Sequence, residues 1–253
     1  MYDELALEAE GTATIRLVNS SWASYLQQAF ARLKALGQQR RANGAEALVK
    51  RLKQTRPSTY DHCLRVTRIA RRTGRTLGFD DAQLKQLSHA AMMHDIGKIL
   101  VPEAILESPR RPTRTERFIL HLHPTLGALL ATYFGLPASL RIRTQHHHER
   151  WDGKGYPHKL GGESIPLMAR IVQVADAYDA MVAVRPYSAP RTHEEAIAEL
   201  RQHQGKQFDP RVIEAFLDSF SDHPMHNYCF NSTLVAPAPP CSGEAGAKRA
   251  TWG

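Results

Sequence analysis

The sequence predicts an all-α protein in which helices pack around one core. Apolar residues recur three or four positions apart over most of the chain, as on one face of a helix, and no segment alternates convincingly as a strand does. Helix-start signals support this: Thr113 and Thr192 each stand three residues before a glutamate, and Asp209 stands directly before a proline. At 253 residues the chain is long enough to bury one sizeable core.

The expected helices can be placed in order along the chain. The first two run from Ser20 to Gly37 and from Ala45 to Lys53, separated by the Asn43-Gly44 break. They form either a dimerisation or docking hairpin or, as we favour, helices packed on the main domain. The later helices are expected from Thr59 to Leu77, from Asp80 or Asp81 to His94, from Thr113 to Phe134, from Pro137 to about His148, from Pro166 through Asp176, from Thr192 onward, and from Pro210 to about Phe220.

These helices divide the chain into three segments. Residues 1–55 hold the first two helices and form an N-terminal helical extension, and residues 56–221 hold the others and form the main domain. Residues 222–253 are rich in proline and glycine and have no periodic apolar face. Because such a segment cannot bury enough apolar surface to fold, we expect a flexible, disordered tail.

Composition narrows the class of protein. Hydrophobic residues make up 42% and charged residues 23%, as in a soluble globular protein, and no apolar stretch approaches the roughly 20 residues that span a bilayer. The three cysteines lack Cys-x-x-Cys spacing, and residues 1–10 lack the charge order of a signal peptide, so a cytoplasmic protein is expected. The net charge of +8 is interpreted as a solvated basic surface, and neither a membrane nor a nucleic-acid polymer is expected as a partner.

A histidine-aspartate pair, His94-Asp95, ends the apolar run of one expected helix. Leu84, Leu87 and Ala91 share a helical face with His94, which places this histidine on the buried stripe. An imidazole nitrogen binds a transition metal, and a carboxylate has two oxygens and can bridge two ions. On its own, however, an internal pair of this kind is more often a satisfied structural contact than a metal site.

Further polar groups fall on the apolar faces of other helices. His62, His123 and Asp176 each do so, and an unpaired polar group in such a position is costly. Three consecutive histidines stand at 146–148. Because neighbours on a helix point about 100° apart, at most two of them can reach one ion, and the last two are chosen as the inward pair. Buried histidines and aspartates on several separate helices are most simply explained by a shared metal.

Seven candidate metal ligands result. They are His62, His94, Asp95, His123, His147, His148 and Asp176. Seven nitrogen and oxygen ligands are too many for one ion and suit two, with Asp95 as the bridge; without thiolates they favour iron or manganese, with zinc as an alternative. Two ions about 3.5–4 Å apart activate a shared water and hold both oxygens of an in-line phosphoryl displacement, so a hydroxide between the metals is the expected nucleophile on phosphorus. Lys98 and Arg185 are candidates for neutralising the phosphate oxygens.

Longer motifs accompany these ligands in a fixed order. They are His94-Asp95-Ile96-Gly97-Lys98, His123-Pro124, the run from His147-His148-Glu149 through Gly155-Tyr156-Pro157, Asp176-Ala177-Tyr178-Asp179, and Arg185-Pro186-Tyr187. From about Ser58 to Phe220 the chain resembles the HD-GYP subgroup of the HD-domain metal phosphohydrolases, which are bacterial cyclic di-GMP phosphodiesterases. The His-Asp pair is shared by many hydrolases, whereas the Gly-Tyr-Pro loop after His-His-Glu is specific to this subgroup.

The resemblance implies an HD-domain helical bundle with two metals. One would be held by His62, His94, Asp95 and Asp176, and the other by Asp95, His123, His147 and His148. Asp95 and Lys98 would be the catalytic residues, and substrate contacts would come from Lys98, Tyr156, Arg185 and Tyr187. The implied reaction is hydrolysis of cyclic di-GMP, or of a related cyclic dinucleotide, to linear pGpG and in part to GMP. The Gly155-Tyr156-Pro157 loop would border the site and either contact diguanylate cyclase (GGDEF) partners or act as a rigid turn; a homodimer is also considered.

Two positions depart from the family pattern. Ser188 follows Arg-Pro-Tyr where members often have a basic residue, which would weaken the grip on substrate. Ser58 stands where some members carry a glutamate for a third metal, so two metals are expected. The alternative function is therefore a weak or inactive relative that serves as a nucleotide receptor or partner-binding module. A mononucleotide hydrolase of the same superfamily is disfavoured by the Gly-Tyr-Pro loop.

Overall fold

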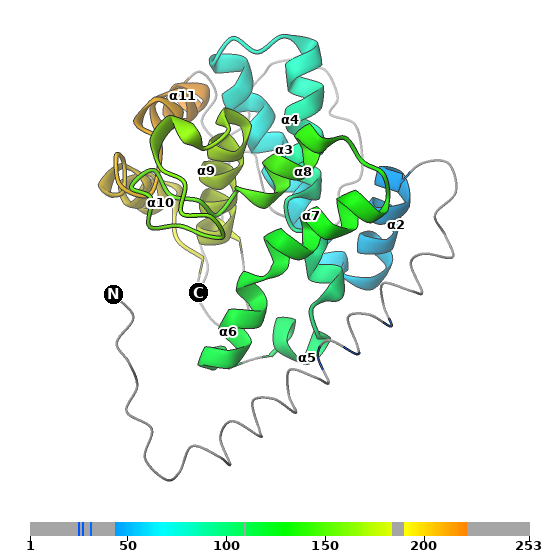
Figure 1. Ribbon diagram of the computed structural model, residues 1–253. Coiled ribbons are helices and arrows are strands. Elements are labelled where there is room, and N and C mark those ends of the chain that lie inside the picture. Colours follow the sequence, from blue (N-terminus) through cyan, green and yellow to red (C-terminus); the bar gives the residue numbers. More distant parts are fainter. Residues whose placement is uncertain are drawn as a thin grey trace, which may run out of the picture.

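The protein is described by a computed structural model that covers residues 44–108, 110–183 and 190–221, together with Tyr25, Gln27 and Ala31. Within these residues the regular structure is entirely helical, without a strand (Figure 1). The all-α prediction is therefore confirmed. Several predictions lie outside the described residues: most of the helix from Ser20 to Gly37, the tail from residue 222, and the roles of Arg185, Tyr187 and Ser188.

The described helices follow in chain order. They are α2 (Gly44–Thr55), α3 (Pro57–Thr76), α4 (Asp81–Met93), the 3-10 helix η1 (Ile96–Leu100), α5 (Glu103–Leu106), α6 (Arg114–His121), α7 (His123–Tyr133), α8 (Ala138–Gln145), the 3-10 helix η2 (Gly162–Ser164), α9 (Leu167–Val182), α10 (His193–Gln202) and α11 (Pro210–Ser221). Capping boxes at Thr113 and Thr192 start α6 and α10, as the sequence indicated. A capping box at Asp80 starts α4, which decides between the two expected starts, Asp80 and Asp81.

The prediction of a single helix from Thr113 to Phe134 is wrong, because the chain turns at Leu122 between α6 and α7. Pro124 has no N–H to donate to the carbonyl of Leu120, four residues earlier, and its ring would crowd that carbonyl. The Leu120 oxygen instead accepts a 2.6 Å hydrogen bond from Nδ1 of His123. The proline thus ends one helix and sets the orientation of a candidate metal ligand.

The expected helix from Pro137 to His148 is also too long. Helix α8 ends at Gln145, and residues 146–148 form a turn. The choice of the inward pair does not depend on this, since His147 is fully buried and His148 is half-buried against the other histidines. His146 turns the other way, toward Glu149 and His158.

The core is built around α3, which contacts α2, α4, α9 and α11. In Figure 1, helices α9 to α11 lie on one side of α3 and α4, and α2 lies on the opposite side. Leu48 and Leu52 of α2 are completely buried in the same hydrophobic cluster as Val66 and Ala70 of α3. The helix expected from Ala45 to Lys53 therefore packs on the main domain.

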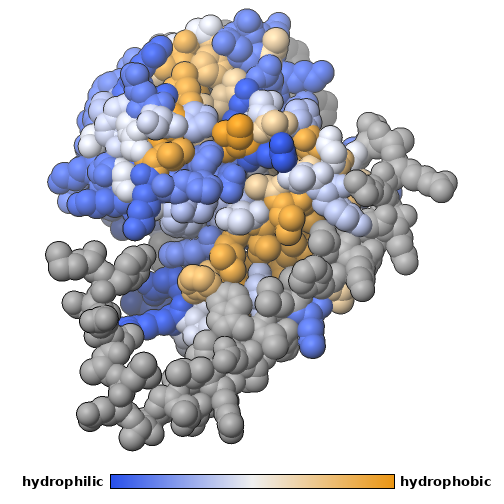
Figure 2. All heavy atoms as spheres, viewed as in Figure 1, coloured by the Kyte–Doolittle hydropathy of each residue, from blue (hydrophilic) through white to orange (hydrophobic). Residues whose placement is uncertain are grey.

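Large hydrophobic side chains are exposed on the neighbouring helices α6, α7 and α8. They are Phe118, Leu129 and Ile142, and Figure 2 shows hydrophobic surface on the face of the molecule that carries these helices. Homodimer formation stays a prediction. Across the described part of the chain, no helix combines the length and the apolar character needed to cross a membrane.

Candidate metal centre

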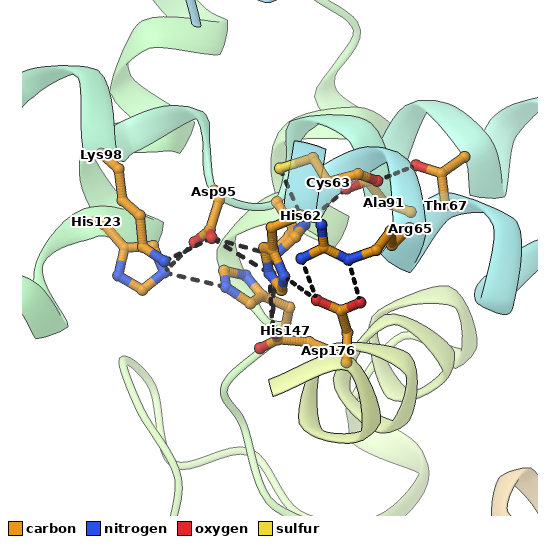
Figure 3. A network of polar contacts seen from close by, with 12 residues as sticks. His62, Cys63, Arg65, Thr67, Ala91, Asp95, Lys98, His123, His147 and Asp176 are labelled. Carbon is orange, nitrogen blue, oxygen red and sulfur yellow. Dashed lines mark hydrogen bonds and ion pairs between the residues drawn. The ribbon is translucent and has the colours of Figure 1, made fainter. Parts of the chain in front are cut away.

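His94 and Asp95 lie where α4 gives way to η1. Helix α4 ends at Met93, and Asp95 occupies the first position before η1, so the two side chains leave the chain at the bend. Both are buried. Figure 3 shows the Asp95 carboxylate among histidines that come from other parts of the chain. A charge taken this far out of water must be compensated by its neighbours, and those neighbours define the site.

Three of the candidate histidines are oriented in the same way. Nδ1 of His94, His123 and His147 lies 2.6 Å from the carbonyl oxygen three residues earlier in each case. A carbonyl only accepts hydrogen bonds, so Nδ1 carries a proton, and Nε2 keeps its lone pair whenever the ring is neutral. Such second contacts are the usual way in which proteins fix metal-binding histidines. Each of these three residues therefore presents one Nε2 as a candidate ligand.

His62 on α3 is oriented by a carboxylate instead. Its Nδ1 lies 2.7 Å from Oδ2 of Asp179, and its Nε2 lies 3.0 Å from Oδ1 of Asp176. Both acids are on α9, three residues apart, and Asp179 is completely buried. Arg65, one turn after His62, holds both Asp179 oxygens at 2.7 and 2.9 Å. Asp179 thus fixes the His62 ring so that Nε2 points toward Asp176.

Asp95 stands between two groups of ligands. The first group is His62, His94 and Asp176, and the second is His123, His147 and His148; within each group the ligand atoms lie within 4.8 Å of one another. Oδ2 of Asp95 is 3.4 Å from Nε2 of His94 and 3.7 Å from Nε2 of His62, whereas Oδ1 is 3.2 Å from Nε2 of His123. One oxygen therefore faces each group, as a bridging carboxylate requires.

The residues at the centre fit divalent metal ions. Nε2 of His123 and Nε2 of His147 are only 3.1 Å apart, although both Nδ1 atoms carry the ring proton. Two lone pairs at that distance repel unless a cation lies between or beside them. Nε2 of His94 is buried and has no hydrogen-bond partner, which is costly unless another group binds it. The imidazole and carboxylate donors suit transition metals.

Burial keeps the three histidines of the second ligand group in their neutral form. Burial lowers the pKa of His123 to about 3 and that of His148 to about 4, and it holds the pKa of His147 well below its usual range. Burial alone would raise the pKa of Asp95, but Lys98 and His94 hold it well below its usual value. Neutral imidazoles and an ionised carboxylate are the forms that bind metals.

Lys98 extends from η1 to the same carboxylate. Its Nζ donates to Oδ2 of Asp95 over 2.6 Å, and its side chain is 26% exposed. Burial lowers the pKa of Lys98, but the neighbouring Asp95 outweighs this and raises it, so the ammonium stays charged. The structure therefore brings a cation to the edge of the centre that faces solvent.

The Gly155-Tyr156-Pro157 loop folds back over the second group. A Cβ on Gly155 would lie 2.4 Å from the Arg150 nitrogen and 2.6 Å from the His148 oxygen, so only glycine allows this approach. Glu149, which is completely buried, accepts hydrogen bonds from the backbone N–H groups of His158 and Leu160. The loop is therefore held at both ends beside His148.

Two residues at the centre are not predicted from the sequence. Asp179 belongs to one of the sequence motifs without an assigned role, although its spacing of three from Asp176 on one helix is a usable signal. Cys63 is completely buried, and its sulfur lies 3.9 Å from Nδ1 of His94. The sequence assigns a role at this point of the helix only to the neighbouring His62, so a buried thiol beside His94 is not predicted.

Asp179→Ala is expected to weaken binding at the first group by roughly 10- to 100-fold, the usual effect of losing a histidine's second partner. The substitution frees Nδ1 of His62 and removes the carboxylate that Arg65 contacts. Asp179→Asn keeps a hydrogen-bond acceptor for His62 and should lose less of the metal affinity. Competition between the protein and a coloured chelator for manganese measures both affinities, and wild-type affinity in Asp179→Ala would contradict this role.

Comparison with known proteins agrees with this architecture. A family model for the HD domain matches residues 28–212. The cyclic di-GMP phosphodiesterase response regulator RpfG of Xanthomonas campestris is 38% identical over 158 residues, which cover 60% of this chain and 41% of that protein. The 3'3'-cGAMP-specific phosphodiesterase 2 of Vibrio cholerae is 32% identical over 166 residues, 65% of this chain and 32% of its own length. Among solved structures, the HDG"Y"P protein Bd1817 of Bdellovibrio bacteriovorus has a TM-score of 0.54 at 18% identity, covering 76% of this chain and 68% of that one.

The chain belongs to the HD-domain family, because the family model matches well over half of it. The predicted HD-domain bundle and the resemblance to the HD-GYP phosphodiesterases are confirmed by these relatives and by the shared fold. The chain spans less than half the length of either curated relative.

Proposed function

We propose that this protein is a metal-dependent phosphodiesterase that opens cyclic di-GMP to linear pGpG. The observation that carries the proposal is the position of Asp95, with one oxygen toward each of two ligand groups. Similarity to named cyclic-dinucleotide phosphodiesterases supports the substrate class. When bound, two divalent ions would supply Lewis acidity and lower the pKa of the attacking water.

The chain's own groups have distinct tasks in this reaction. His62, His94 and Asp176 would hold one ion and His123, His147 and His148 the other, with Asp95 shared between them. The Lys98 ammonium lies within hydrogen-bonding distance of Asp95 and reaches the solvent-facing edge, where a phosphate would arrive. It would neutralise the charge that develops on the phosphate oxygens. Arg185 and Tyr187 are further proposed contacts to the substrate.

Turnover is tested with purified protein loaded anaerobically with iron(II) or manganese and incubated with cyclic di-GMP, 3'3'-cGAMP or cyclic di-AMP. Chromatography then separates the linear dinucleotides from the mononucleotides. We expect conversion of cyclic di-GMP, with pGpG as the main product. If the metal-loaded protein binds a cyclic dinucleotide without hydrolysing any of them, the receptor alternative, which Ser188 favours, replaces the enzyme.

Lys98→Ala is expected to keep both ions and to lower kcat by about 10²–10³-fold, the usual effect of losing one charge-stabilising donor. Removing a cation from beside Asp95 cannot weaken the hold on other cations, so metal content should not fall. Steady-state kinetics and elemental analysis of the same samples separate the two effects. Lys85→Ala, an exposed lysine on α4, is the control. A fall in metal content in Lys98→Ala would show that its assigned role is mistaken.

Two ions per chain are expected rather than three. A third ion beside His62 would need another anionic ligand one helical turn earlier, where the chain has Ser58. A neutral, exposed hydroxyl there cannot offset the repulsion of three gathered cations. Elemental analysis of fully loaded protein gives the count, and anomalous scattering gives the positions. Three fully occupied ions would contradict this prediction.

Contact with GGDEF proteins through the Gly155-Tyr156-Pro157 loop is a further proposal about partners. His158 and Lys159, directly after the loop, are exposed and lie where such a protein would contact the loop. Binding of a purified GGDEF domain should be lost in a His158→Ala/Lys159→Ala double variant if this surface is used. Binding that survives in the variant would place the contact elsewhere.

A further inference from the structure

Tyr156 lies between two histidine rings. One face of its ring stacks on His121, with centroids 4.4 Å apart and planes 16° from parallel. The other face stacks on His148, with centroids 4.9 Å apart and planes at 22°. His121 is the last residue of α6, so this stack joins α6, the Gly-Tyr-Pro loop and the second ligand group. None of the motifs in the sequence involves His121.

The stack limits what Tyr156 can do. Because histidine rings stack on both faces of the ring, these faces are not free to stack on a nucleotide base. The predicted substrate contact of Tyr156 is therefore restricted to a hydrogen bond. The covered faces point instead to a role toward His148.

His148 is held differently from the other candidate ligands. The rings of His94, His123 and His147 are fixed by Nδ1 hydrogen bonds to carbonyls, and that of His62 is fixed by Asp179. In the described part of the chain, the contacts of the His148 ring are with other rings: those of His123, His147 and Tyr156. Its orientation therefore depends on ring packing, in which Tyr156 stacks on the His148 ring.

The position of the Tyr156 ring depends in turn on His121. The backbone N–H of Tyr156 donates to the His148 carbonyl over 3.2 Å, which places the start of its side chain but leaves the ring free to rotate away. His121 stacks on the Tyr156 ring at 4.4 Å and opposes this rotation. The turn at Leu122 between α6 and α7 is what brings His121 to this position.

We propose that His121 is a positioning residue that clamps Tyr156 against His148 and thereby orients His148 as a ligand of the second metal. The inference rests on the proposed two-metal function. Stacking requires a flat ring and not an imidazole in particular, so phenylalanine at 121 should preserve the effect and alanine should remove it.

The test measures manganese affinity in the wild-type protein and in His121→Ala, His121→Phe and Arg114→Ala, by chelator competition. Arg114 is an exposed residue at the other end of α6 and serves as the control. We expect about tenfold weaker binding of one of the two ions in His121→Ala, at the low end of the usual effect of an outer partner. His121→Phe and Arg114→Ala should stay within about twofold of the wild type. Equal affinity in His121→Ala and the wild type would overturn the proposal.

A double-mutant cycle separates clamping from a general structural effect. If His121 acts through Tyr156, adding His121→Ala to Tyr156→Leu should weaken manganese binding no further. A full additional loss in that background would mean that His121 acts by another route and would also overturn the proposal.

Hydrogen exchange gives a readout that needs neither activity nor metal. In the metal-free protein, His121→Ala should speed exchange of the Tyr156 amide, which donates to His148, and His121→Phe should restore its protection. Unchanged exchange in His121→Ala would count against the clamp. If the wild-type protein hydrolyses no cyclic dinucleotide, the proposed function fails, while these binding and exchange results still decide the role of His121.

Discussion

Asp95→Ala is expected to remove both metal ions and to abolish hydrolysis of cyclic di-GMP while the helices persist. Asp95 is the ligand whose two oxygens face both groups, at 3.2 Å from His123 and at 3.4 Å from His94. Without it each group keeps only three ligands, and no shared carboxylate holds the two ions together. Loss of a shared ligand should reduce activity by at least about 10⁴-fold, the order of the smallest loss seen when one member of a catalytic unit is removed.

The matched control for Asp95→Ala is Asp61→Ala. Asp61 directly precedes His62 but is exposed, so the same chemical change is made one residue from a ligand without touching the centre. Elemental analysis, circular dichroism and product analysis should find the control unchanged. A full complement of two ions in Asp95→Ala would mean that Asp95 does not bridge them.

The fold class and most helix starts could be predicted from the sequence because their causes are local. A threonine three residues before a glutamate satisfies backbone donors at a helix start whatever surrounds it, and Thr113 and Thr192 both do so. The ends of helices were less predictable. The break before Pro124 was missed because apolar spacing continues across it, although proline chemistry was a sufficient warning.

That the candidate ligands meet could be predicted because ligand chemistry is restricted to a few residue types on apolar faces, while metal binding by them stays a prediction. The groups that orient the ligands could not, because they depend on which elements meet in space. Asp179 reaches His62 from a helix more than a hundred residues away, and His121 reaches Tyr156 from an exposed position that carries no pattern. An exposed histidine at the end of a short helix has many possible uses, and only the fold selects one.

The largest expected loss of stability comes from Gly97→Ala. A Cβ on Gly97 would lie 1.9 Å from the His123 carbonyl oxygen and 2.6 Å from the Gly127 nitrogen. Both are backbone atoms, so neither can move aside as a flexible side chain would, and η1 would have to separate from α7. Overpacking of a buried site typically costs 1–3 kcal/mol and sometimes more, and we expect at least the upper end, about 3 kcal/mol.

In a chain of this size such a loss lowers the melting temperature by about 6–12 °C, if the variant folds at all. Gly135→Ala is the control, because its Cβ would meet nothing within 4 Å and only its φ of 68° is unfavourable for alanine, at about 1–2 kcal/mol. Thermal unfolding of both variants compares the loss of stability from overpacking with the loss from backbone strain alone. Because Gly97 lies between Asp95 and Lys98, separation of η1 from α7 would also draw Asp95 away from His123, so surviving Gly97→Ala protein should bind manganese weakly. Melting within a degree or two of the Gly135→Ala control would show that η1 and α7 can part at little cost and that their contact does not fix the centre.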